Sequence, residues 1–231
     1  MSARRRTDRD WRRRQLGQNF LDPATADQIV DQAAFAPGEL VVEIGAGSGV
    51  LTRALARRAL RVVAVEPDPA WARRLREQTA GSAPGVHVVA RDFLAVTLPR
   101  EPFRVFGSLP FARTTDILHC LLDDPAIPMR RADVIVQWEV AVKRAATPPV
   151  TLISTAWAPW WEIRLARRIP ATVFRPVPRV DAGLLAITRL DPPLLPIAMA
   201  RPFRDFVQRE WPFDSARQRR RSVALSDVGS M

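Results

Sequence analysis

The sequence has few of the residues that form disulfides and metal centres. Its 231 residues include one cysteine, Cys120, and two histidines, His87 and His119. A single cysteine excludes an internal disulfide, and two histidines so far apart in the chain give no metal-ligand cluster to propose. We therefore expect a protein of the reducing cytoplasm that binds no metal ion.

Long apolar runs are also missing. No stretch of about 18 uninterrupted apolar residues occurs, which is the length that a membrane-spanning helix needs. The N-terminus is rich in arginine and lacks the apolar segment of a signal peptide. We expect neither a membrane span nor a signal peptide. The hydrophobic content of 47% is nevertheless enough to bury the core of one full-size domain with a small appendage.

The positive charge is carried by arginine and lies at the two ends. The net charge is +11, Lys143 is the only lysine, and tyrosine is absent. Residues 1–14 contribute +5 and residues 201–221 contribute +4 of this charge. Guanidinium groups suit phosphate well, so these ends are predicted to contact nucleic acid; solvated basic tails and a coding bias toward arginine stay open as alternatives. The candidate contacts are Arg4, Arg5, Arg6, Arg12, Arg13, Arg14, Arg217, Arg219, Arg220 and Arg221.

Residues 40–49, LVVEIGAGSG, form the segment around which the chain is organised. A short apolar run followed by glycines at every second position predicts a buried strand, a tight turn and a packed helix. Glycine at these positions leaves no side chain between the strand end and a ligand. The spacing G-x-G-x-G differs from the dinucleotide fingerprint G-x-G-x-x-G. A ligand without phosphates is therefore predicted, although glycines that serve only as a turn remain the alternative.

The apolar pattern along the chain predicts a parallel α/β sheet. Seven strands are expected, the first being the run that precedes the glycines, followed by residues 61–65, 86–90, 103–106, 133–138, 161–168 and 180–189. Asp22 before Pro23 predicts a capped helix that runs to about Ala34. Further helices are expected after Pro67, near Asp116, and from Thr151 to Ala158.

Acidic residues follow two of the predicted strands. Glu66 comes directly after residues 61–65, and Asp92 follows the strand at 86–90. In parallel sheets, ligands collect outside the carboxyl ends of the strands. Glu66 can therefore accept both hydroxyls of a ribose, and Asp92 can accept from the exocyclic amine of a purine. Roles as a helix cap for Glu66 and as a loop cap for Asp92 stay open.

The strand at residues 103–106 ends in the segment Ser108-Leu109-Pro110-Phe111. Proline fixes the backbone, so the neighbouring carbonyl and the aromatic ring are held in place. Such a turn can clamp a flipped-out base, which stacks on Phe111 while Ser108 and a main-chain carbonyl accept from its amino group. A turn with a core phenylalanine is the alternative. Trp157, Trp160 and Trp161 resemble a stacking cluster, but burial against the sheet is the preferred interpretation.

Seven segments, taken in order, resemble the Erm family. These are 18–21 (QNFL), 43–49 (EIGAGSG), Glu66, Asp92, 108–111 (SLPF), 137–141 (QWEVA) and 174–182 (FRPVPRVDA). Erm proteins are S-adenosylmethionine-dependent adenine N6-methyltransferases of 23S ribosomal RNA that confer macrolide, lincosamide and streptogramin B resistance. The resemblance spans roughly residues 12–190. It implies a class I Rossmann-like methyltransferase fold with a seven-stranded, mostly parallel sheet whose last two strands form an antiparallel hairpin at one edge.

The resemblance also implies roles for individual residues. The catalytic turn that receives the target adenine is Ser108, Leu109, Pro110 and Phe111. Gln18, Asn19, Gly45 and Gly47 are expected at the methionine end of the cofactor, Glu66 at its ribose and Asp92 at its adenine. The full set of expected cofactor contacts is Gln18, Asn19, Leu21, Gly45, Ala46, Gly47, Glu66, Pro67, Asp92, Phe93 and Ser108.

Three units of the chain follow from this resemblance and from the charge distribution. They are a basic arm at residues 1–14, a catalytic domain at 15–190 and a short, helical, arginine-rich extension at 191–231. Family members carry a small helical domain after the strand at 180–189, whereas the remaining residues here suffice for one or two helices. The implied protein is a cytoplasmic monomer that acts on 23S ribosomal RNA before ribosome assembly is complete.

The sequence departs from the family at Ser108. Family members carry asparagine there, although the wider group of amino-methylating enzymes accepts aspartate, asparagine or serine. Two other functions therefore stay open. A small-subunit dimethyladenosine transferase shares most of the motifs, and a catalytically impaired RNA-binding homologue would keep the fold without the transfer.

Overall fold

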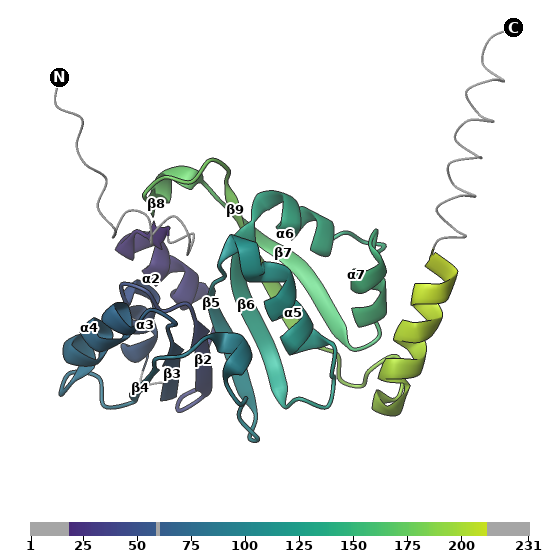
Figure 1. Ribbon diagram of the computed structural model, residues 1–231, viewed down its shortest axis with the longest axis horizontal. Coiled ribbons are helices and arrows are strands. Elements are labelled where there is room, and N and C mark those ends of the chain that lie inside the picture. The colour runs from purple at the N-terminus through teal and green to yellow at the C-terminus, as the bar shows by residue number, and fades with distance from the viewer. Residues whose placement is uncertain (1–18, 59–60, 212–231) are drawn as a thin grey trace, which may run out of the picture.

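The computed structural model describes residues 19–58 and 61–211. Its centre is a seven-stranded sheet of order β4-β3-β2-β5-β6-β9-β7 (Figure 1). The pairs from β4 to β6 are parallel, whereas β9 runs antiparallel to both β6 and β7. This arrangement confirms the predicted mostly parallel α/β fold with its antiparallel edge. The strands are β2 (Leu40–Ile44), β3 (Arg61–Val65), β4 (Val86–Val89), β5 (Phe103–Ser108), β6 (Met129–Gln137), β7 (Trp161–Ile169) and β9 (Ala182–Arg189).

Helices cover both faces of the sheet. One apolar cluster joins the inner sides of α2 (Pro23–Gln32), α3 (Val50–Ala56) and α4 (Pro69–Thr79) to the sheet. The second cluster joins α5 (Thr114–Leu122), α6 (Trp138–Arg144) and α7 (Leu152–Trp157) to the opposite face. Burial on both faces explains why the central strands β2 and β5 read as mostly apolar runs, whereas the edge strand β7 alternates between charged and apolar residues. Residues 200–211 form a further helix, which packs on the second cluster through Phe203.

Local sequence signals set where two of these helices begin. Asp22 caps α2 by accepting a hydrogen bond from the Thr25 N–H at 3.0 Å. Asp68 caps α4 in the same way, accepting from the N–H groups of Ala70 and Trp71 at 2.8 and 3.3 Å. In both helices proline occupies the first turn, where its missing N–H costs nothing.

The order of the strands reverses between β2 and β5. The chain builds β2, β3 and β4 outward in one direction and then returns to place β5 on the other side of β2. The two strands approach closely because Gly107 pairs with Ile44, and a side chain at Gly107 would collide with the Ile44 carbonyl oxygen. Such a reversal opens a crevice above the carboxyl ends of the strands. The glycine turn after β2 and the Ser108 turn after β5 meet there.

The structure corrects several predicted boundaries. The predicted strand at 133–138 is wrong at both ends, because β6 begins at Met129 and Trp138 already belongs to the unpredicted helix α6. The sharp change from strand to helix at Gln137 explains the error, since Trp138 and Val140 have strong strand propensity. Helix α2 ends at Gln32, and β9 begins at Ala182.

A second, two-stranded sheet was not predicted. β1 (Phe20–Leu21) pairs antiparallel with β8 (Phe174–Arg175), and the Asp22 N–H also donates to the Val173 carbonyl at 2.8 Å. Each strand is only two residues long, too short for a periodic pattern to reveal it. This small sheet joins the start of the described chain to the segment before β9.

The short 3-10 helices are η1 (Phe93–Ala95), η2 (Phe111–Arg113), η3 (Ala171–Val173) and η4 (Ile197–Met199).

The tryptophan cluster lies in the core. Trp157, Trp160 and Trp161 are each 2% exposed, and each indole N–H has an acceptor, on Asp123, Leu195 and Leu122 respectively. The interpretation as core residues is confirmed, and these rings are not available to stack on RNA.

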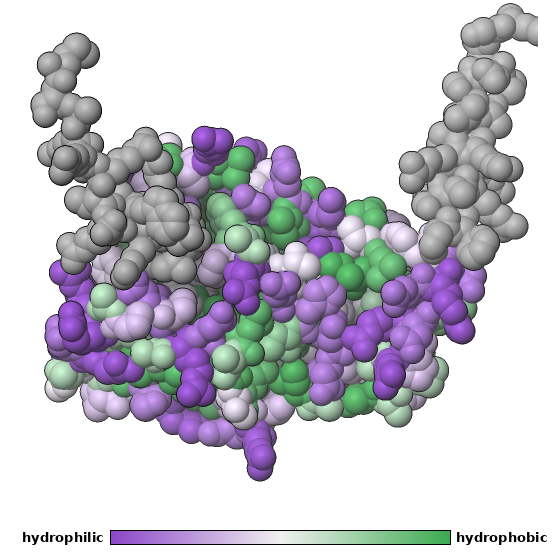
Figure 2. Space-filling view, in the orientation of Figure 1, coloured by the Kyte–Doolittle hydropathy of each residue, from purple (hydrophilic) through white to green (hydrophobic). Residues whose placement is uncertain are grey.

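The outer surface carries both polar and apolar residues. The face shown in Figure 2 mixes hydrophilic and hydrophobic side chains, as folded proteins generally do. Among the described residues, none of the helices combines the length and apolar character needed to cross a membrane.

Candidate active site

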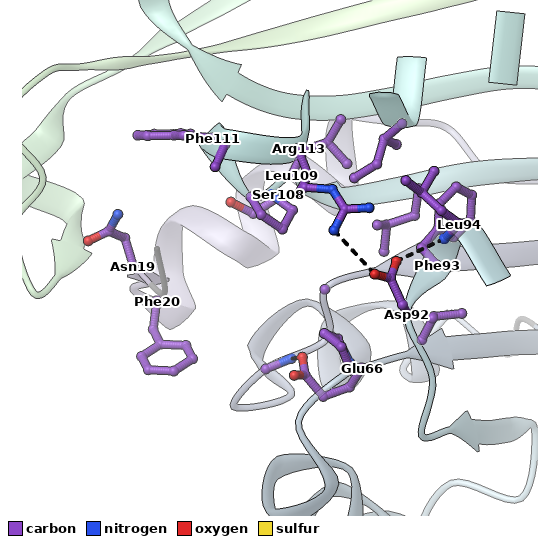
Figure 3. Close-up of a pocket in the computed structure, with 18 of the residues that line it drawn as sticks. Asn19, Phe20, Glu66, Asp92, Phe93, Leu94, Ser108, Leu109, Phe111 and Arg113 are labelled. Atoms are coloured by element: carbon purple, nitrogen blue, oxygen red, sulfur yellow. Dashed lines mark hydrogen bonds and ion pairs between the residues drawn. The ribbon is translucent and has the colours of Figure 1, made fainter. Parts of the chain in front are cut away.

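A cavity of about 270 Å³ lies at the carboxyl ends of the strands, where their order reverses (Figure 3). Its wall comes from the segment at Phe20, the turns after β2, β3 and β5, the loop after β4, Ile117 near the start of α5 and Phe174 of β8. Eleven residues predicted from the sequence line it, namely Asn19, Gly45, Gly47, Glu66, Pro67, Asp92, Phe93, Ser108, Leu109, Pro110 and Phe111. The two halves of the predicted site therefore face a single space.

The glycine turn allows two close approaches. A Cβ at Gly45 would lie 3.2 Å from the Ser108 carbonyl oxygen, and one at Gly47 would lie 2.9 Å from Cε1 of Phe20. Both glycines also have positive φ, 72° and 52°, which side chains disfavour. The turn is thus shaped so that the backbone itself forms one wall of the cavity.

Glu66 anchors this turn from the neighbouring strand. Its carboxylate accepts a hydrogen bond from the Gly47 N–H at 2.7 Å and another from the Asp68 N–H at 2.9 Å. The residue is 2% exposed. Burial raises the pKa of Glu66, and the two backbone N–H groups oppose that rise. Glu66 lies at the cavity with acceptor capacity remaining on both oxygens.

A second buried carboxyl, Glu43, lies beneath the turn. It is fully buried, and Oε2 accepts a 2.6 Å hydrogen bond from the Thr52 hydroxyl, whereas Oε1 has no partner among the described residues. Burial raises the pKa of Glu43 to about 7, and the charge of Glu66 adds to the rise. Glu43 does not line the cavity, and its side chain points to α3 through Thr52. Glu43 opens the family segment 43–49 but is not among the cofactor contacts expected from the sequence.

Asp92 serves as a cap and also lines the cavity. Its Oδ1 accepts from the Leu94 N–H at 3.0 Å, which caps η1, and its Oδ2 pairs with Nη1 of Arg113 at 3.3 Å (Figure 3). Asp92 therefore has the role of a loop cap that the sequence left open as an alternative. The cap does not exclude the ligand role, because Asp92 and its partner Arg113 both line the cavity and each carboxylate oxygen can accept a further hydrogen bond.

The Ser108 turn is held by backbone bonds. The Leu109 N–H donates to the Ile135 carbonyl at 2.9 Å, and the Pro110 carbonyl accepts from the Arg113 N–H at 2.9 Å and the Thr114 hydroxyl at 3.1 Å. Among the described residues, no hydrogen bond is found for the Ser108 hydroxyl, which lines the cavity. The turn presents this hydroxyl and the Phe111 ring from a fixed backbone.

Some predicted residues lie elsewhere. Leu21 and Ala46 are core residues that do not line the cavity. Gln18 and the ten candidate RNA-contacting arginines lie outside the described residues. Other residues of the wall are not among the contacts expected from the sequence, and these include Phe20, Phe174 and Arg113. Phe174 opens one of the family segments, which was a usable signal; nothing in the local sequence marked Arg113.

A family model described as ribosomal RNA adenine dimethylase matches residues 9–217. The chain belongs to this family. An rRNA methyltransferase of Streptomyces thermotolerans is 43% identical over 88% of this chain and 68% of its own length. The mycinamicin-resistance protein MyrB of Micromonospora griseorubida is 41% identical over 79% of this chain and 58% of its own length. This chain thus spans between about half and three quarters of the length of such relatives.

The structural comparison agrees with this family assignment. The crystal structure of the 23S rRNA methyltransferase ErmE superposes with a TM-score of 0.74 and 34% identity over 82% of this chain and 78% of ErmE. A dimethyladenosine transferase from Plasmodium falciparum, 17% identical with a TM-score of 0.67, shares the fold. The resemblance to the Erm enzymes is confirmed, and with it the predicted methyltransferase class.

Proposed function

We propose that this chain transfers a methyl group from S-adenosylmethionine to N6 of a flipped-out adenine in 23S ribosomal RNA, and thereby confers macrolide-type resistance. The observation that carries this proposal is the meeting of two sets of groups in one cavity. The Gly45–Gly47 turn, Glu66 and Asp92 line one part of it, and Ser108 to Phe111 line the other. The names of the relatives, rRNA adenine N-6-methyltransferases and 23S rRNA methyltransferase ErmE, support the substrate.

The cavity wall suits S-adenosylmethionine. This cofactor has no phosphate, and no cation other than Arg113 lines the cavity among the described residues. At Gly45 and Gly47 the backbone itself forms the wall, because a Cβ there would press on the Ser108 carbonyl oxygen and the Phe20 ring. In this proposal Glu66 accepts from the ribose hydroxyls and Asp92 accepts from the adenine amine of the cofactor. When bound, the cofactor would supply an activated sulfonium methyl.

The chain's own task is then to capture and orient the adenine. Phe111 lines the cavity, is only partly buried and can stack on the face of a purine, whereas Phe174 is a buried residue that supports the wall from behind. The Pro110 carbonyl already accepts two hydrogen bonds, so we assign the acceptor role for the amino group to the Leu109 carbonyl and the Ser108 hydroxyl. Two acceptors on one amino group direct its lone pair out of conjugation and toward the methyl. Alignment of this kind, without a general base, is the proposed source of catalysis.

The remaining predictions are part of the same proposal. The arm at 1–14 and the arginines at 217–221 would contact RNA phosphates, with the catalytic domain at 15–190 between them and the extension beginning at 191. We propose that the enzyme works as a cytoplasmic monomer on ribosomal RNA before assembly is complete.

A labelling experiment tests the function. Purified protein is incubated with methyl-labelled S-adenosylmethionine and deproteinised 23S or 16S ribosomal RNA, and the labelled base is mapped. We expect label on an adenine of 23S RNA. Label on 16S RNA would identify a small-subunit dimethyladenosine transferase instead. Binding of RNA with no incorporation into either would leave an RNA-binding homologue.

A further inference from the structure

Arg113 is the one cation that lines the cavity within the described parts of the chain. It is the last residue of η2 and immediately precedes α5. Its side chain is 46% exposed, so its charge stays solvated at little cost. Arg113 lies between the two halves of the site, and the cofactor and base contacts proposed above give it no role.

The guanidinium of Arg113 bridges two carboxylates. Nη1 lies 3.3 Å from Asp92 Oδ2, and Nε lies 3.3 Å from Asp116 Oδ2. Figure 3 shows the side chain extending from the Phe111 end of the cavity to Asp92. The two bonds use different N–H groups of one rigid fork, which a lysine does not have. The side chain thus ties the loop after β4 to the first turn of α5.

The backbone of Arg113 belongs to the other half of the site. Its N–H donates to the Pro110 carbonyl at 2.9 Å and so closes the turn of η2, which begins inside the Ser108–Phe111 segment, and the hydroxyl of the next residue, Thr114, donates to the same carbonyl at 3.1 Å. The side chain of Arg113 therefore binds Asp92, which is proposed to contact the adenine of the cofactor. Its main chain binds the Ser108–Phe111 segment, which is proposed to hold the target adenine.

We propose that Arg113 is a positioning residue that couples cofactor binding to capture of the target base. This inference rests on the function proposed above. Arg113 orients Asp92 toward the adenine amine of the cofactor, and an Asp92 fixed by that amine in turn holds Arg113 and the turn it closes. Cofactor and RNA then raise each other's affinity by the same factor, as linkage requires.

Calorimetry with S-adenosylhomocysteine measures this coupling without turnover. Its affinity is determined for the parent, Arg113→Gln, Arg113→Lys and the control Arg91→Gln, each with and without a saturating hairpin of 23S RNA. Arg91 is exposed and adjacent to Asp92, and Arg91→Gln removes one positive charge just as Arg113→Gln does. Because the Arg113–Asp92 pair is exposed, Arg113→Gln should weaken cofactor binding only about two- to fivefold. It should also abolish most of the RNA-induced increase in affinity, whereas Arg91→Gln should retain it.

Two further variants separate positioning from other roles. In an Asp92→Asn background, Arg113→Gln should cause no additional loss, because the pair is already broken. Arg113→Lys should keep part of the cofactor affinity and recover little of the coupling, since its ammonium is a point charge on a flexible stem and does not hold the two carboxylates in the fixed geometry of a guanidinium fork. Thermal melting of each variant reports whether the fold is intact.

Three results would overturn the inference. Equal behaviour of Arg113→Gln and Arg91→Gln would remove any special role, and a loss of RNA affinity alone would make Arg113 a phosphate contact. Additive losses in the double variant would show that Arg113 does not act through Asp92. A parent protein that binds neither S-adenosylhomocysteine nor RNA would instead refute the proposed function, and so the two failures are distinguishable.

Discussion

Glu66 holds Gly47 through a buried 2.7 Å hydrogen bond from the Gly47 N–H to Oε2. The bond joins the end of β3 to the turn after β2, so the group proposed to bind ribose also shapes the wall that the cofactor would contact. Glu66 is therefore expected to act twice, once as an acceptor for the ligand and once as a support for the turn.

Glu66→Ala should weaken S-adenosylmethionine binding. The ribose loses charge-assisted hydrogen bonds of roughly 1.5 to 3 kcal/mol, which corresponds to an affinity loss of about 10- to 150-fold. Calorimetry measures the effect, and Glu162→Ala, which removes an exposed carboxylate on β7, serves as the control. An unchanged affinity would remove Glu66 from the binding site.

Ser108 and Phe111 should differ in how they affect catalysis. Loss of stacking in Phe111→Ala should cost roughly 1 to 3 kcal/mol of RNA binding and also lower turnover.

Ser108→Ala should lower turnover by up to about a hundredfold, because the lost acceptor acts where charge changes in the reaction. The RNA KM should rise by a smaller factor. Ser108→Asn should be active, since an amide carbonyl reaches further and is always an acceptor.

Steady-state methylation of a 23S RNA hairpin separates these effects. Phe206→Ala, an exposed phenylalanine outside the cavity, provides the control for loss of a ring. If Ser108→Ala turns over at the parental rate, the Ser108 hydroxyl is not needed, and the Leu109 carbonyl and the Phe111 ring suffice to orient the target base.

Glu43 should make stability depend on pH. Its folded-state pKa of about 7 lies above the value near 4.3 of an unfolded glutamate, so the native state binds the extra proton. Stability from this group is complete below about pH 4 and is lost as the pH rises through 7, with a total on the order of 3 kcal/mol. Glu43→Gln, which cannot ionise but can still bond Thr52, should flatten the decline in unfolding free energy between pH 5 and 8.

Urea denaturation across this pH range checks the prediction. Glu77→Gln is the matched control because Glu77 is exposed on α4. If the parent and Glu43→Gln lose stability equally from pH 5 to 8, Glu43 is ionised throughout and the assigned pKa is wrong.

Removal of residues 1–14 should reduce the salt dependence of RNA binding. Each phosphate contact contributes about 0.9 or less to the slope of log K against log salt. The arm carries seven arginines, so a decrease of several units is expected if most of them contact RNA. Filter binding at several salt concentrations measures the slope, and an unaltered slope would show that the arm does not contact phosphates.

The sequence by itself determined the sheet and most of the residues that line the cavity. The apolar pattern locates β2, β3 and β4, because each is a short, mostly apolar run that is followed within three residues by a glycine or an acid. Parallel strands end at the same edge, so Gly45, Glu66 and Asp92 could be brought together without knowledge of the packing. The family segments added the expectation that the Ser108 turn joins them.

Only the tertiary structure decided the relations between distant segments that have no local pattern. The two-residue pairing of β1 with β8 places Phe174 on the cavity, and the change from β6 to α6 occurs inside a run of strand-forming residues. The bridge from Arg113 to Asp92 spans 21 positions and two exposed side chains. A contact of this kind leaves no trace in periodicity or composition, because its geometry is set by how β4, β5 and α5 pack and not by any single stretch of sequence.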